Sequence, residues 1–126
     1  MTTEEIPHTD WNRFFDTFSR QHEGWLATLE VLGREVGAQE EAHELPLAGV
    51  SLSSGKDTET ISIDLGLTPN DHVSRAISHP ARVYLEKTDA GANAALQIET
   101  ADGTKTLLRF RSTMPPEFVD GVVLDR

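Results

Sequence analysis

The fold is decided by the stretch Asp10-Trp11-Asn12-Arg13-Phe14-Phe15-Asp16-Thr17-Phe18-Ser19-Arg20-Gln21-His22-Glu23-Gly24-Trp25. The aromatic residues at positions 11, 14, 15 and 18 follow the spacing of one face of an α-helix. Thr9 or Asp10 can accept a hydrogen bond at the helix start, and Gly24 suits the left-handed conformation that often ends a helix. The pattern predicts an amphipathic helix over residues 9–24. We expect its aromatic face to be core, since each buried aromatic contributes roughly 2–3 kcal/mol.

After Gly24 the apolar residues recur at every second position, which is the period of a β-strand. The alternation continues around residues 25–31, 61–65, 73–77, 83–85, 96–98 and 108–110. We therefore predict an α+β fold, with the N-terminal helix packed on a mostly antiparallel β-meander of six or seven strands. Such a meander forms a twisted sheet or a small barrel.

The length of 126 residues predicts a single domain. Residues 1–8 are expected to be a flexible tail, residues 25–111 the β-meander and residues 112–126 a C-terminal extension. Within that extension, Pro116 favours a helical turn that docks Phe118.

The composition of residues 38–45 suits either a polar strand near a sheet edge or a helix. Charged side chains at an edge hinder unwanted pairing. Pro46 is expected to end this segment, and residues 53–57 to form a loop.

The last hairpin allows a prediction of register. A two-residue loop at Asp102-Gly103 would place Arg109 on the core face. A three-residue loop over residues 101–103 pairs Leu96 with Leu108, and it keeps the two apolar faces matched. We therefore predict the three-residue loop, with Gly103 in the left-handed conformation of a β-bulge.

Composition excludes several classes of function. The chain has no cysteine, which rules out disulfides, thiolate metal sites and a cysteine nucleophile, and suits the reducing cytoplasm. Residues 1–66 carry 13 acidic and 4 basic residues, and the net charge of the chain is −10. This charge disfavours binding to nucleic acid and to anionic membranes. It indicates a solvated acidic surface, or a face for a basic partner.

No phosphate-binding glycine loop, nucleophile elbow or H-E-x-x-H zinc motif occurs, so no cofactor is predicted. The best candidates for a ligand or metal site flank the short strand around residues 73–77, where loops often hold function. These candidates are Asp71, His72, Arg75, His79 and Tyr84. A metal site would require the turn at Pro80 to bring the two histidines together.

The other ionisable groups have structural interpretations as well as functional ones. His22 lies near the helix C-terminus, where a cationic imidazole is favourable. Glu41 and His43 would share a strand face, but two ligands do not make a metal site. The carboxylates of residues 40, 41 and 44 suit a solvated edge better than acid–base catalysis. The outward Arg82, Arg109 and Arg111 suit cross-strand pairing with Glu86 and Glu99, or anion binding.

Much of the chain resembles a known family. The resemblance rests on residues 11–25, on Glu44-Leu45-Pro46-Leu47, and on three later runs. These runs are residues 71–86, residues 96–99 and Ala101-Asp102-Gly103-Thr104-Lys105-Thr106-Leu107-Leu108-Arg109-Phe110. Together they are similar to a bacterial family of short, soluble domains of unknown function. The resemblance implies a bacterial one-domain protein, and it supplies no activity or catalytic residue.

Three hypotheses follow. The first is a non-enzymatic module that binds a protein or a small molecule. The second is an enzyme or metal site around the five candidate residues at positions 71, 72, 75, 79 and 84. The third is a structural homodimer formed through an exposed sheet edge.

Overall fold

The computed structural model describes residues 2–33, 37–55 and 58–111. Its helices are η1 (His8–Asp10), α1 (Trp11–His22) and η2 (Pro69–Asp71). Its strands are β1 (Thr2–Glu5), β2 (Leu26–Gly33), β3 (Gly37–Gly55), β4 (Thr58–Leu65), β5 (Val73–Ser78), β6 (Pro80–Lys87), β7 (Asn93–Thr100) and β8 (Lys105–Phe110). The predicted α+β class is confirmed. None of the helices in these ranges has the length and apolar character needed to cross a membrane.

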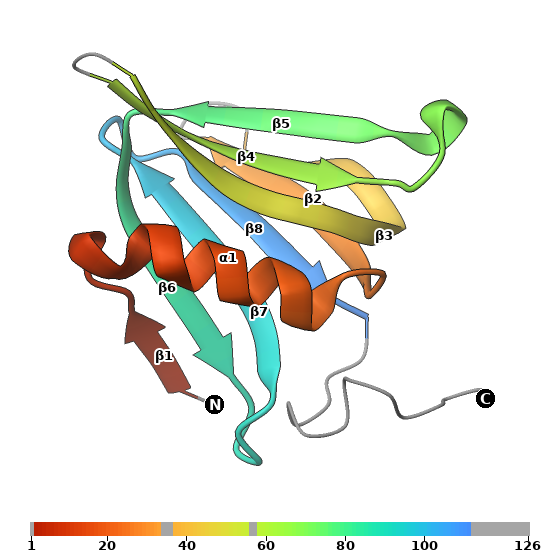
Figure 1. The fold of residues 1–126 in the computed structure, drawn as a ribbon, viewed down its shortest axis with the longest axis horizontal. Coiled ribbons are helices and arrows are strands. Elements are labelled where there is room, and N and C mark those ends of the chain that lie inside the picture. The colour runs from red at the N-terminus through yellow and green to blue at the C-terminus, as the bar shows by residue number, and fades with distance from the viewer. Residues whose placement is uncertain (1, 34–36, 56–57, 112–126) are drawn as a thin grey trace.

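The strands form one open antiparallel sheet in the order β1-β6-β7-β8-β2-β3-β4-β5. It consists of two meanders, β2 to β5 and β6 to β8, joined where β8 pairs with β2. Helix α1 crosses one face of the sheet in front of β6, β7 and β8 (Figure 1). Its aromatic residues share one apolar core with side chains from most of the strands.

The aromatic face of α1 is buried, as the spacing of its residues predicts. Trp11 and Phe15 are each 1% exposed, Phe18 is 2% exposed, and Phe14 packs against the core at its margin. Gly24 has the expected positive φ of 86°. The predicted side-chain cap is wrong, because the Asp10 carboxylate accepts a hydrogen bond from Arg13 at 2.9 Å instead. Asp10 already belongs to η1, so its backbone is helical rather than in the extended conformation that a capping residue usually has.

The N-terminal residues differ from the flexible tail expected over residues 1–8. Residues 2–5 form β1, which pairs antiparallel with β6 and places Thr2 opposite Lys87. Ile6 is buried, and its carbonyl accepts a hydrogen bond from the Trp11 indole at 3.0 Å. β1 is therefore an eighth strand, beyond the six or seven predicted.

Residues 38–45 are a strand, and that strand does not end at Pro46. β3 continues to Gly55 and extends into the expected loop at residues 53–57, of which 56 and 57 lie outside the described ranges. The first half of β3 pairs with β2 and the second half with β4. Proline is tolerated where the chain passes between these ladders, next to a bulge at Glu44, whose φ is 50°. The turn predicted at Pro116 also lies outside the described residues.

The predicted register of the last hairpin is confirmed. Leu96 pairs with Leu108 and Ile98 with Thr106, around a three-residue loop at 101–103. Gly103 has φ 92° and donates its N–H to the Thr100 carbonyl at 3.0 Å. The matched apolar faces thus decide the loop length.

His22 is structural, but it is not the cationic helix-end group expected from its position. Its ring is 2% exposed and stacks on Phe110 with a centroid separation of 4.9 Å. Burial lowers the pKa of His22 below its ordinary value, and this outweighs the opposing effect of a hydrogen bond to the Phe18 carbonyl. The imidazole is therefore held neutral in the core.

Candidate functional site

A groove of about 390 Å³ lies between β5 and the turn that joins β7 to β8. Four consecutive residues, 75–78, form one wall with His79 at its end. Thr100, Ala101, Asp102 and Thr104 form the other wall. The groove brings together two of the five predicted site residues, Arg75 and His79.

Arg75 supplies the positive charge of this groove. Its side chain is half-buried, and it forms no ion pair or hydrogen bond with any residue the structure describes. Its Nε is fully buried without an acceptor. Most other described arginines interact with a carboxylate, as Arg13 does with Asp10 and Arg20 with Asp16. Arg75 therefore retains hydrogen-bond donors that the described residues leave unused.

The opposite wall is a rigid turn. The Asp102 carboxylate accepts a hydrogen bond from the Thr100 hydroxyl and another from the Thr104 backbone N–H at 3.0 Å. These hydrogen bonds, that from Thr100 foremost, lower the pKa of Asp102 to about 2. The carboxylate is therefore committed to the turn, and it is too weak a base to accept protons near neutral pH.

His79 forms the corner between β5 and β6. Its φ of 56° is left-handed, and its backbone N–H donates to the Glu59 carbonyl at 3.2 Å. The imidazole is exposed and lines both this groove and a neighbouring hollow of about 580 Å³. A strained corner therefore presents this histidine to two hollows at once.

Asp71 and His72 lie at the opposite end of β5. Asp71 ends η2 and accepts a hydrogen bond from the Thr68 hydroxyl at 3.3 Å. His72 Nε2 lies 3.7 Å from the Asp64 carboxylate, which also accepts a hydrogen bond from Ser74. Because the six residues of β5 span roughly 20 Å, the turn at Pro80 does not bring His72 to His79.

Tyr84 lies apart from both ends of β5. It is on β6, between Glu5 of β1 and Gln97 of β7. Its hydroxyl oxygen accepts a hydrogen bond from Arg82 at 3.4 Å. The five candidates thus do not meet in one cleft.

The remaining charged candidates interact mainly with one another. Within the described ranges, no three His, Cys, Asp or Glu side chains are grouped closely enough to hold a metal ion. His43 Nδ1 lies 3.0 Å from the Glu40 carboxylate. Arg109 pairs with Glu30 of β2, and Arg111 lies 3.8 Å from Glu44. These acidic partners of Arg109 and Arg111 are not the cross-strand glutamates expected from the sequence.

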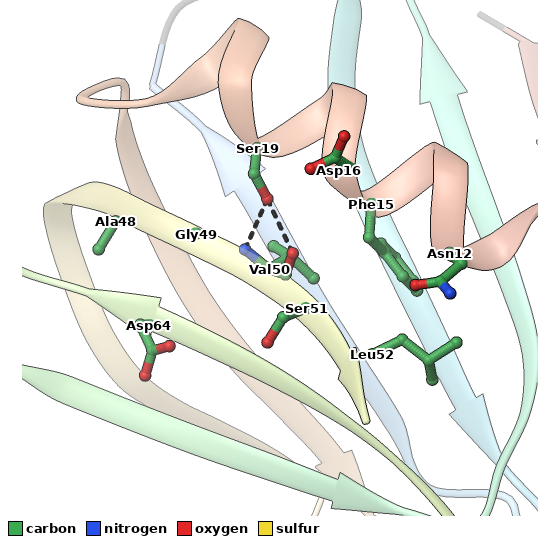
Figure 2. Close-up of a pocket in the computed structure, with 10 residues that line it drawn as sticks. All are labelled: Asn12, Phe15, Asp16, Ser19, Ala48, Gly49, Val50, Ser51, Leu52 and Asp64. Carbon is green, nitrogen blue, oxygen red and sulfur yellow. Dashed lines mark hydrogen bonds between the residues drawn. The ribbon is translucent and has the colours of Figure 1, made fainter. Parts of the chain in front are cut away.

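A third hollow, of about 370 Å³, lies between α1 and the second half of β3. Figure 2 shows Ser19 pointing from the helix to the Val50 backbone. The Ser19 hydroxyl donates to the Val50 carbonyl and accepts from the Val50 N–H, both at 2.8 Å. The carboxylates of Asp16 and Asp64 also line this hollow, but each already accepts a hydrogen bond from a neighbouring side chain.

Sequence reasoning missed the second wall of the groove. The sequence identifies the turn at residues 100–104 only as a hairpin connection. Its position opposite β5 depends on the order and curvature of strands that belong to different meanders. The Thr-x-Asp-x-Thr pattern at 100–104 indicates a rigid turn, and nothing local to it indicates what lies across from it.

Comparison with known proteins gives a family without an assigned function. Residues 2–117 match a family described as "Family of unknown function (DUF5335)". An uncharacterized protein of Aquifex aeolicus (strain VF5) is 30% identical over 115 residues, which cover 91% of this chain and 97% of that protein. No solved structure matches the chain. The match over nearly its whole length shows that the chain belongs to this DUF5335 family of unknown function.

Proposed function

We propose that this protein is a non-enzymatic module that binds a carboxylate- or phosphate-bearing ligand in the groove between β5 and the β7–β8 turn. The observation that carries the proposal is the half-buried Arg75 on the groove wall, which has no acidic partner among the described residues. A buried donor left without an acceptor costs roughly 1–3 kcal/mol. A ligand that supplies an acceptor recovers this cost.

The chemistry of the groove suits an anion of modest size. A guanidinium presents planar, forked donors that match carboxylate and phosphate oxygens. The net charge of −10 opposes anion binding at long range, but salt screens charges beyond about 8 Å at physiological ionic strength. Within the groove, the Asp102 carboxylate keeps its negative charge, but two hydrogen bonds hold it to its own turn and it does not pair with Arg75. The donors of Arg75 are therefore available to an anion that reaches them.

The same geometry supports binding without catalysis. The Thr100 hydroxyl donates to a carboxylate whose pKa is about 2, so this pair lacks an effective base. Catalysis by the five residues that the sequence offers as a site (positions 71, 72, 75, 79 and 84) remains a hypothesis. We also propose a cytoplasmic location, which the cysteine-free composition favours.

The test is a titration of the ¹⁵N-labelled protein with sodium acetate and with inorganic phosphate, followed by NMR. Saturable shifts at residues 75–79 and 100–104 are expected for at least one anion. They should be lost in Arg75→Gln and kept in Arg82→Gln, a matched control on the exposed face of β6. Equal shifts in both variants, or none in the native protein, would overturn the proposal.

A further inference from the structure

We propose that the ligand is an extended acidic peptide segment that adds as a strand to the free edge of β5. This inference rests on the proposed function, because it uses the same groove and the same Arg75. It adds a second mode of recognition, which is hydrogen bonding to the β5 backbone.

Hydrogen-bond alternation shows which backbone groups of β5 are free. Because Ser19 bonds both the N–H and the C=O of Val50, these groups point away from β4. Val50 is opposite Ile63, so in an antiparallel ladder the polar groups of Ile63 point toward β5, where Arg75 is its partner. Alternation then turns the N–H and C=O of Ser74, Ala76 and Ser78 outward. The hydrogen bond from the His79 N–H to the Glu59 carbonyl fits this alternation, because the backbone groups of His79, like those of Arg75, should point toward β4.

Among the described residues, none pairs with the outer edge of β5. β5 is the last strand of the sheet, and no described residue bonds the outward groups at positions 74, 76 and 78. The side chains at these three positions are small and exposed, and the β4–β5 register contains no bulge. Native proteins usually blunt such an edge with bulges, proline or charge. The opposite edge, β1, is only four residues long and carries Glu4 and Glu5.

The groove fits a single extended chain. It runs beside residues 75–78, about 13 Å of strand, and the turn at 100–104 stands as a wall across from them. Because this turn limits the width of the groove, the groove favours a single peptide strand over the sheet edge of a second folded copy of this protein. In such a strand, alternate side chains lie on the same face as Arg75. An acidic side chain there supplies the acceptor that Arg75 lacks.

The experiment uses the blocked peptide acetyl-Thr-Val-Glu-Val-Thr-amide and its Gln counterpart, with acetate as the small anion. We expect the Glu peptide to slow amide exchange at Ala76 and Ser78, and to bind about tenfold more tightly than the Gln peptide. Ala76→Pro removes an outward N–H without breaking the β4 ladder, so it should abolish peptide binding and keep acetate binding. Ala76→Ser keeps the N–H and should bind both.

The outcomes separate the two proposals. Acetate binding without amide protection by either peptide would overturn the peptide inference and leave the proposed function standing. Absence of binding by acetate, by inorganic phosphate and by both peptides would overturn both proposals. If scattering shows a concentration-dependent dimer that Ala76→Pro abolishes, the edge belongs to a second copy and the peptide inference is wrong. If Ala76→Pro fails to fold, amide exchange in the native protein with each peptide decides.

Discussion

Asn93 donates a hydrogen bond from its side-chain amide to Nε2 of His22 over 3.1 Å, joining residues 71 positions apart inside the core. His22 Nδ1 lies 2.8 Å from the Phe18 carbonyl, which can only accept, so Nδ1 carries the proton. Both nitrogens of a neutral imidazole are then satisfied. A second proton would remove the acceptor that Asn93 requires and place a charge among aromatic rings.

This arrangement predicts that acid weakens the fold through His22. Because the folded-state pKa is lowered, its contribution to stability is complete above the unfolded pKa of about 6.5 and declines as pH falls below it. In this pH range, His22 binds a proton in the unfolded chain but not in the folded chain. The free energy of unfolding should fall by up to about 1.4 kcal/mol per pH unit in this window. Urea denaturation from pH 7.5 to 5 measures it.

The control for this slope is an exposed histidine. His22→Phe should flatten the pH dependence below 6.5, whereas His43→Gln, at a solvent-exposed position, should keep it. A native slope that survives in His22→Phe would assign the acid sensitivity to another group.

Two glycines with similar φ values predict different tolerance of a methyl group. A Cβ at Gly66, where φ is 92°, would lie 2.2 Å from the Asp71 carbonyl oxygen. Gly91 has φ 86° and nothing within 4 Å of its Cβ position. We expect Gly66→Ala to cost about 2–4 kcal/mol through strain and overlap, and Gly91→Ala about 1 kcal/mol through strain alone. Thermal denaturation of both variants compares them, and equal losses would contradict the steric explanation.

Ser19→Ala should destabilise the protein by about 1–3 kcal/mol, because it leaves both polar groups of Val50 without their partner. Exchange of the Val50 amide should become faster at the same time. Ser53→Ala, an exposed position on the same strand, should change stability by less than about 0.5 kcal/mol. Unfolding in urea together with amide exchange tests the pair, and a slow Val50 amide in Ser19→Ala would refute the bridging role.

Arg75→Met should raise stability by about 1 kcal/mol while abolishing anion binding, because it removes a buried donor that lacks an acceptor and keeps the apolar stem. Opposite effects on stability and binding are typical of a functional group held at a cost to the fold. Denaturation and phosphate titration of the same variant measure both. A loss of stability would instead assign Arg75 a structural role.

The parts of the fold that the sequence could predict are those set by local chemistry. The aromatic residues from Trp11 to Phe18 line one face of a helix, and burial in the core is the low-energy arrangement for them. In the last hairpin, matched apolar faces permit only the three-residue loop before Thr104. β1 could not be found in this way, because Thr2 to Glu5 carry no apolar alternation and form a strand only against β6. The passage of β3 through Pro46 likewise depends on two partner strands.

The candidate site was half predictable for the same reason. Arg75 and His79 were found as ionisable groups beside one short strand. The direction in which β5 runs then separates them from His72, and the sheet order brings Asp102 opposite. Distances within one strand follow from residue spacing, whereas proximity between meanders requires the three-dimensional fold.

The placement of β1 has a consequence for synthesis on the ribosome. Thr2 pairs with Lys87, and β2 lies between β3 and β8, the last described strand. After Thr2 emerges, β1 therefore waits for more than eighty further residues, which takes roughly 4–17 seconds at 5–20 residues per second. During that interval β2 to β5 can pair with one another, while the core residues that β6 to β8 contribute beside the aromatic face of α1 are still missing. Nascent chains arrested before β6 should therefore recruit holdase chaperones, and chains released after β8 should not.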